Sequence, residues 1–284
     1  MLGTIGIVRK ILPTRVKRIL GTALYKSMCR FPLLTVIVAP ILYGISVKLQ
    51  PGKTFLIQHQ GTKIVYPRSA SQVEDLSLFV EIFRDQPYEQ FFGVPQGGIV
   101  VDIGAHIGIF TIKAAKAAGE KGLVVAIEPE PSNIALLLNN IAVNEITNVI
   151  VVAKAASSYK GKPKLYLSHS SGGHSLVNSL DNYIEVETDS LDNIMSELGL
   201  PRVDFVKIDA EGSELEVLKG AEKLLASHDV KLSIAAYHRL EDGMPEFPQI
   251  RIFLEQRGFN ISTKNSSFIY GSRTRVTIAP ELAI

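Results

Sequence analysis

The order of short apolar runs and helical segments constrains the fold of this chain more than any other feature. Short, predominantly apolar runs occupy residues 99–103, 123–127, 149–153, 203–208 and 231–236. Apolar residues at helical spacing occupy residues 107–118, 132–143, 213–225 and 248–257. Because strands that are apolar on both sides must be covered on both faces, this alternation predicts a doubly wound α/β domain built on a parallel sheet.

Other segments predict antiparallel strands and a connecting helix. Residues 53–66 predict a hairpin that turns at Gln60 and Gly61, and residues 258–279 predict an antiparallel pair at the edge of the sheet. Between them, apolar residues at helical spacing predict a helix that ends at Pro87. We therefore expect an N-terminal extension over residues 1–70 and a main domain over residues 71–284.

The N-terminal extension is basic and apolar. Eleven Lys and Arg residues and no acidic residue precede Glu74, whereas the rest of the chain carries 19 basic and 28 acidic residues. Residues 31–47 contain no charged side chain and two prolines, and seventeen residues are marginal for a helix that must span about 20. Two interpretations stay open: a helix that lies on an anionic membrane surface, with residues 1–50 as the contact, and a segment that packs onto the main domain.

The same segment bears on localisation. Its basic residues would hold the N-terminus in the cytoplasm, so a spanning helix would export the main domain. No small-residue cleavage site follows the apolar run closely, which disfavours a signal peptide. The single cysteine, Cys29, cannot form an internal disulfide, which favours a reducing compartment. We expect a cytoplasmic protein, held at the membrane periphery where the first interpretation applies.

The sequence VVDIGAHIGIFTI, residues 100–112, places a glycine turn between the first apolar run and its helix. Doubly wound sheets bind their ligands beyond the carboxyl ends of the strands. A dinucleotide fingerprint needs glycines where this chain has His106 and Ile109. Asp102 would repel a diphosphate, whereas it suits the cationic amino end of S-adenosylmethionine. The turn therefore favours S-adenosylmethionine over a nicotinamide or flavin dinucleotide, with a plain tight turn and a capping acid as the structural alternative.

Three more motifs lie after later strands or helices. They are IEPEPSN at residues 127–133, followed by Asn140 and Asn144, SSGGHS at residues 170–175, and VDFVKIDAEGSELEVLKG at residues 203–220. Together with the glycine turn, this ordered set resembles the FkbM-type family of S-adenosylmethionine-dependent methyltransferases over residues 70–270. The resemblance implies a Rossmann-like seven-stranded methyltransferase sheet with an antiparallel last strand, S-adenosyl-L-methionine as cofactor, and methyl transfer to oxygen.

Carried onto this chain, the resemblance assigns the cofactor contacts. The methionine end would lie against Asp102, Gly104, Ala105 and Gly108. Glu128 would accept hydrogen bonds from the ribose hydroxyls, with Pro129 against the adenine, and Ala155 and Ala156 would lie near the adenine edge. As alternatives, Glu128 caps the helix that follows, and the alanines belong to the ordinary core.

Methyl transfer to a hydroxyl needs alignment and a group that takes the hydroxyl proton. Asp209 and Glu211 after the fourth strand and His238 after the fifth are the catalytic candidates, and we expect them to share one site. His238 is the preferred base because its ordinary pKa lies nearest neutrality. The three could instead ligate a divalent cation, which we rank below a metal-free route. His174 in the SSGGHS loop either closes over the substrate or is an exposed loop residue, and Lys207 is expected to pair with a neighbouring acid.

The sequence thus predicts an S-adenosylmethionine-dependent O-methyltransferase that acts on a hydroxyl of a small molecule, a glycan or a lipid-linked acceptor. A nucleotide-dependent oxidoreductase is the alternative enzyme. A non-catalytic cofactor-binding scaffold at the membrane is the alternative from another class. Nucleic acid is not an expected partner, because the basic residues interleave with aliphatic ones and no recognition motif is present.

Overall fold

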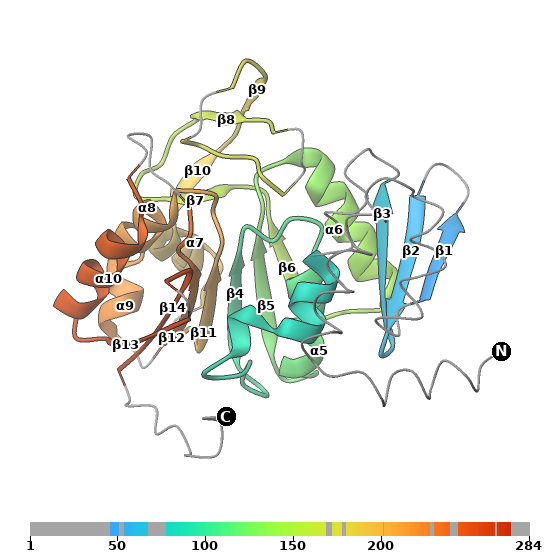
Figure 1. Ribbon diagram of the computed structural model, residues 1–284, viewed down its shortest axis with the longest axis horizontal. Coiled ribbons are helices and arrows are strands. Elements are labelled where there is room, and N and C mark those ends of the chain that lie inside the picture. Colours follow the sequence, from blue (N-terminus) through green and yellow to red (C-terminus); the bar gives the residue numbers. More distant parts are fainter. Residues whose placement is uncertain are drawn as a thin grey trace, which may run out of the picture. The chain divides into compact units, whose positions relative to one another are not determined.

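The computed structural model describes nine segments of the chain: residues 46–50, 54–67, 78–168, 172–177, 180–200, 202–227, 230–238, 244–264 and 266–273. The chain divides into two compact units, Met1–Glu81 and Ile82–Ile284. The labelled helices and strands of both units are drawn in Figure 1.

The first unit contains a three-stranded antiparallel sheet. Its strands are β1 (Ser46–Gln50), β2 (Thr54–His59) and β3 (Thr62–Pro67), in that order. Gln60 and Gly61 connect β2 to β3 with φ values of 47° and 75°, the positive values that a two-residue hairpin turn of matching twist requires. The predicted hairpin is confirmed.

Most of the predicted membrane-surface segment lies outside the described residues. Of residues 31–47, only Ser46 and Val47 are described, and they begin β1. In the part of the chain that the structure describes, no helix combines the length and the apolar character needed to span a bilayer. The two interpretations of residues 31–47 therefore stay predictions.

The second unit is built on a seven-stranded sheet (Figure 1). Across the sheet the order is β13-β14-β12-β11-β4-β5-β6. The strands are β4 (Ile99–Ile103), β5 (Leu123–Ile127), β6 (Val149–Val152), β11 (Phe205–Ile208), β12 (Lys231–Ala235), β13 (Asn260–Lys264) and β14 (Phe268–Ser272). Strands β6, β5, β4, β11 and β12 pair in parallel, and β14 pairs antiparallel with both β12 and β13. The predicted doubly wound sheet with an antiparallel last strand is confirmed.

Helices cover both faces of this sheet. α5 (Ile109–Ala118) and α6 (Pro131–Val143) lie on one side of it, and α8 (Glu214–Lys219), α9 (Glu222–Ser227) and α10 (Phe247–Gln256) lie on the other (Figure 1). The central strands are buried accordingly, with Val100, Val124, Phe205 and Ile234 each 0% exposed. The predominantly apolar runs therefore form strands that are buried on both faces, as their composition predicted.

One predicted helix is divided. The sequence predicts a single helix over residues 213–225, whereas the structure has α8 and α9, which Gly220 and Ala221 separate. A Cβ at Gly220 would lie 1.9 Å from the carbonyl oxygen of Ser157. The helix therefore breaks where glycine lets its backbone contact β7 (Ala155–Ser157).

Short elements between residues 155 and 197 were not predicted from the apolar pattern. They are β7, β8 (Lys164–Tyr166), β9 (Tyr183–Glu185), β10 (Thr188–Ser190) and α7 (Leu191–Glu197). β7 pairs in parallel with β10, and β8 pairs antiparallel with β9. Strands of three residues are too short to show a period of two.

The predicted connector helix is only partly described, because residues 71–77 lie outside the described segments. A π-helical turn, η1 (Glu81–Asp85), precedes a 3-10 turn, η2 (Pro87–Glu89). The change of helix type at Pro87 fits the predicted stop, because proline lacks the N–H that continues a helix.

Candidate active site

The loops that follow β4, β5, β11 and β12 lie at the carboxyl edge of the sheet. The strand order reverses at β4, since β5 and β6 extend the sheet on one side of it and β11 and β12 on the other. Doubly wound folds bind their ligands in the crevice at such a point. The predicted site residues come from these four loops, from the end of β4 and from β7.

The glycine turn after β4 is shaped by the protein backbone. Gly104 has a φ of +71°, and a Cβ there would lie 1.9 Å from the carbonyl oxygen of Asp209. The N–H groups of Gly104 and Ala105 both donate to the carbonyl oxygen of Ile127, at 3.1 Å. Gly108, with a φ of +89°, is the N-cap of α5. Glycine at 104 therefore allows the turn to pack directly against the loop that carries Asp209.

Asp102 is 0% exposed and its carboxylate is engaged within the protein. Thr111 Oγ1 donates to Oδ2 at 2.5 Å, and Lys207 Nζ lies 3.0 Å from Oδ1. Burial by itself lowers the pKa of Lys207, but the charges of Asp102 and Asp209 outweigh burial and raise it, so Lys207 stays charged. The predicted pairing of Lys207 with a neighbouring acid is confirmed. The negative charge of Asp102 is balanced by this partner.

Glu128 follows β5 directly and is 5% exposed. Its Oε2 accepts from the N–H of His106 at 2.8 Å, and its Oε1 accepts from the N–H of Glu130 at 3.0 Å. Burial raises the pKa of Glu128, and these hydrogen bonds oppose that rise. The N-cap of α6 is Glu130, whose side chain accepts from the N–H of Asn133. The alternative in which Glu128 caps this helix is therefore wrong.

The remaining predicted cofactor residues pack near these loops. Pro129 is half-buried beside Glu128. Ala155 and Ala156 lie in β7, are 7% and 5% exposed, and belong to hydrophobic clusters of the core. Their contact with an adenine ring stays a prediction.

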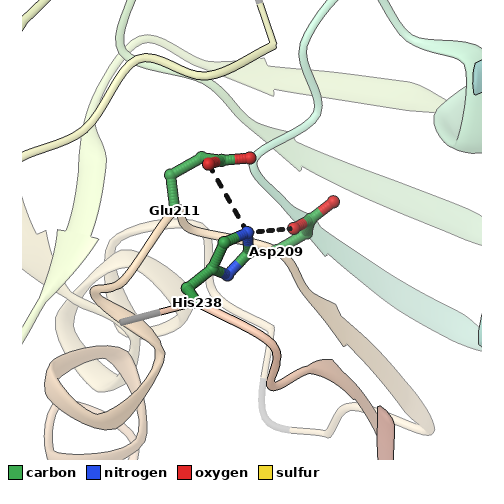
Figure 2. A group of neighbouring side chains, drawn as sticks. All are labelled: Asp209, Glu211 and His238. Carbon is green, nitrogen blue, oxygen red and sulfur yellow. Dashed lines mark ion pairs between the residues drawn. The ribbon is translucent and has the colours of Figure 1, made fainter. Parts of the chain in front are cut away.

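Asp209 and Glu211 follow β11, and His238 follows β12; their side chains point toward one another (Figure 2). The Nε2 atom of His238 lies 3.8 Å from Asp209 Oδ1 and 3.4 Å from Glu211 Oε2. Because β11 and β12 pair in parallel, the loops at their carboxyl ends are neighbours. We expected these three residues to share one site, and the structure brings them together.

Two further side chains orient this cluster. Tyr88 Oη donates to Asp209 Oδ2 at 2.6 Å. Glu214 is 0% exposed and its Oε1 lies 2.8 Å from His238 Nδ1. Its carboxylate also accepts the N–H groups of Ala210 and Gly212, at 2.8 Å and 3.0 Å. Glu214 therefore holds both the loop after β11 and the imidazole in place.

The electrostatic surroundings of His238 are unusual. Burial alone would lower its pKa, but the neighbouring carboxylates of Glu211, Glu214 and Asp209 outweigh burial and raise the pKa to about 11. Burial and the neighbouring Glu214 raise the pKa of Glu246 to about 9, so Glu246 is protonated at neutral pH and leaves the negative charge on Glu214. The surrounding carboxylates therefore favour a positive charge at this point of the site. The ordinary pKa that made His238 the preferred base does not apply here.

The SSGGHS loop is described from residue 172 onward. It lies near the loop after β11 and near the loop after β4. Ser175 Oγ donates to the carbonyl oxygen of Glu211 at 2.6 Å. A Cβ at Gly172 would lie 3.9 Å from His106 Cε1. The Nδ1 atom of His174 accepts from the N–H of Ser168 at 3.0 Å, and burial lowers the pKa of His174. A role for His174 toward the substrate stays a prediction.

Sequence reasoning missed Tyr88 and Glu214. In the sequence, Glu214 stands as an acid in the first turn of a helix, a position that the helix dipole alone explains. Tyr88 precedes Asp209 by 121 residues, so no local spacing links the two. Only complete burial marks Glu214 as part of the site, and burial of a single side chain is not visible in sequence.

Comparison with known proteins identifies related sequences. A family model described as the methyltransferase FkbM domain matches residues 102–261. The chain is 28% identical over 225 residues to methyltransferase sdnD of Sordaria araneosa, which covers 68% of this chain and 85% of that protein. It is 25% identical over 222 residues to Methyltransferase 1 of Beauveria bassiana, which covers 70% of this chain and 87% of that protein. A crystal structure of methyltransferase FkbM from Methylobacillus flagellatus KT matches with a TM-score of 0.48 and 22% identity, over 68% of this chain and 47%, under half, of that one.

Proposed function

We propose that this chain, which belongs to the FkbM methyltransferase family, transfers a methyl group from S-adenosylmethionine to a hydroxyl oxygen. One observation carries the proposal. The glycine turn, Glu128 and the acidic loop after β11 all fall within the matched residues, and direct contacts join them in the fold. Gly104, which has no Cβ, lies close to the backbone carbonyl of Asp209, and the N–H of His106 donates to Glu128.

The loops after β4 and β5 are the proposed cofactor site. Gly104, Ala105 and Gly108 would line the methionine end, and Glu128 would accept hydrogen bonds from the ribose hydroxyls beside Pro129. Ala155 and Ala156 keep their proposed place near the adenine. Asp102 is the exception, because its side chain is 0% exposed and its charge is balanced by Lys207. We assign Asp102 the indirect role of holding the glycine turn through Lys207, which also donates to the carbonyl oxygen of Gly104 at 2.8 Å.

Methyl transfer requires the protein mainly to align the acceptor oxygen with the methyl group of S-adenosylmethionine. The methyl carbon is already activated by the positive sulfur, and correct placement of two reactants can supply about 7–11 kcal/mol of a barrier. The acceptor hydroxyl must also lose its proton. The backbone of Asp209 packs against Gly104 at the proposed methionine end. The cluster of Asp209, Glu211 and His238 is therefore the proposed place where the acceptor oxygen is held.

A variant pair tests the cofactor site. Glu128→Gln removes a charged acceptor, and hydrogen bonds to charged groups contribute about 1.5–3 kcal/mol. We expect the affinity for S-adenosylmethionine, measured by calorimetry, to fall about tenfold or more. The exposed Glu120, replaced by Gln, is the control and should leave affinity unchanged. Unchanged affinity in the Glu128 variant would contradict the site.

The proposed acceptor is a hydroxyl on a small molecule, a glycan or a lipid-linked molecule. Incubation of the protein with methyl-labelled S-adenosylmethionine and fractionated cell extract should label one such product. Binding of S-adenosylmethionine without any labelled product would instead favour the non-catalytic scaffold. The oxidoreductase alternative has lost its support, because the matched family is one of methyltransferases.

A further inference from the structure

Asp209, Glu211 and His238 each offer one ligand atom to a common point (Figure 2), and all three atoms lie within 4.8 Å of one another. Atoms that bind one small divalent cation at 2.0–2.2 Å lie about 3 to 4 Å apart. The separations of 3.8 Å and 3.4 Å from His238 Nε2 to the two carboxylate oxygens fall in this range. These two separations are therefore compatible with a cation bound between the three side chains.

A direct hydrogen bond from Nε2 to either carboxylate fits this geometry less well. A hydrogen bond between a charged imidazole and a carboxylate spans about 2.7–2.9 Å, which is shorter than either separation. Among the described residues, His238 Nε2 and Asp209 Oδ1 have no hydrogen-bond partner although both atoms are buried. The His238 side chain is 10% exposed. Buried polar atoms that face one another at this distance indicate a ligand between them.

The neighbouring side chains set the ligands in the orientation that a cation needs. Glu214 Oε1 lies 2.8 Å from Nδ1 of His238, so Nδ1–H donates to a carboxylate and Nε2 faces Asp209 and Glu211. Metal-binding histidines usually make this second contact to a carboxylate or carbonyl. Tyr88 Oη donates to Oδ2 of Asp209 at 2.6 Å and leaves Oδ1 directed at the same point.

We propose that Asp209, Glu211 and His238 bind one divalent cation of the Mn²⁺ or Zn²⁺ type. One imidazole nitrogen with two carboxylate oxygens suits these ions, whereas Ca²⁺ takes about six to eight oxygen ligands at longer distances. Three protein ligands leave coordination positions open. An oxygen of the methyl acceptor can occupy one of them.

The role of the ion rests on the proposed function, whereas the site itself does not. A hydroxyl bound to a divalent cation releases its proton to solvent more readily. The oxygen then attacks the methyl carbon of S-adenosylmethionine, the carbon–sulfur bond breaks, and its electron pair stays on sulfur. The products are a methyl ether and S-adenosylhomocysteine. His238 acts in this scheme as a ligand, so no histidine base is needed.

Metal binding is tested on the full-length protein after chelation and dialysis. Titration with Mn²⁺ alone, followed by electron paramagnetic resonance, and with Zn²⁺ alone, followed by calorimetry, should each show one ion per chain. Glu211→Gln and Asp209→Asn keep the shape of each ligand and remove its charge, and we expect each to weaken binding at least tenfold. Glu216→Gln is the matched control, because Glu216 belongs to α8 and its side chain is 42% exposed.

The results separate the two proposals. Failure of both ions to bind saturably, or equal affinity in the wild type and both variants, would overturn the metal site. Glu211 keeps 27% of its side chain exposed, so its variant should fold, and circular dichroism checks this. S-adenosylmethionine affinity, measured on the same metal-free samples, tests the proposed cofactor site separately from the metal site. Labelling of acceptor at full rate in the presence of EDTA would overturn the role of the ion.

Discussion

Replacing Gly104 by alanine tests whether glycine is required here by the backbone conformation and by the close contact with the Asp209 loop. Its φ of +71° lies in the left-handed region, where an L-residue costs about 1–2 kcal/mol. The new Cβ would lie 1.9 Å from the carbonyl oxygen of Asp209, so one of the two loops must move. Overpacking of this kind costs about 1–3 kcal/mol more. We expect Gly104→Ala to lower the free energy of unfolding by about 2–5 kcal/mol, a large part of the 5–15 kcal/mol typical of proteins.

Gly258→Ala is the matched control. Gly258 has a similar φ of +78°, but a Cβ there would have nothing within 4 Å. The control therefore carries the backbone cost of about 1–2 kcal/mol without the collision. The difference between the two variants measures the contact of Gly104 with Asp209.

Urea unfolding followed by circular dichroism measures both variants, since the chain contains no tryptophan for a fluorescence signal. Movement of the Asp209 loop should also weaken Mn²⁺ binding in Gly104→Ala and leave it unchanged in Gly258→Ala. Equal destabilisation of the two variants, within about 0.5 kcal/mol, would refute the claim that the loops are in rigid contact.

Three further predictions concern charge. Lys207→Met leaves Asp102 buried and unpaired, so urea unfolding should show a loss of about 3–5 kcal/mol; adding Asp102→Asn should recover part of it, and no recovery would argue against the pair. Burial would raise the pKa of Asp189, but hydrogen bonds from Asn193 and Lys154 outweigh it and lower the pKa to about 2. The unfolded value is about 3.9, so Asp189 stabilises the fold by roughly 2 kcal/mol above pH 4, and this stabilisation is lost as the pH falls toward 2. Unfolding midpoints of Asp189→Asn should therefore depend less on acid pH, and parallel curves would contradict the assignment. Finally, we propose that residues 1–50 bind anionic membranes: the protein should sediment with phosphatidylserine vesicles at low salt and be released at high salt, whereas no sedimentation at low salt would exclude the idea.

The sequence predicted elements best where the pattern was local. The bounds of β4 and β5 agree with residues 99–103 and 123–127, because short, mostly apolar runs between turns leave little choice. The division of α8 from α9 was not predictable, since Gly220 breaks the helix through a contact with Ser157. That contact joins segments that only the folded chain brings together.

In the candidate site too, local patterns were readable from the sequence and contacts between remote residues were not. The glycine turn, the acid at 128 and the motif after β11 are each readable as short patterns, and strand order alone places them at one edge of the sheet. The choice of His238 as the base rested on its ordinary pKa. In the structure, that pKa no longer applies, because three carboxylates lie within 4 Å of the ring: those of Asp209, Glu211 and Glu214.

By itself, the amino-acid sequence determined the parallel sheet, the family resemblance and the loops that bear acidic residues, because apolar runs and glycine turns act over a few neighbouring positions. Only the tertiary structure decided which charged partners each ionisable side chain has. Asp102 is balanced by Lys207 from another strand, and His238 is surrounded by three carboxylates from the loop and helix after β11. Electrostatic energies change steeply over a few ångströms, and such distances between remote residues exist only once the chain has folded.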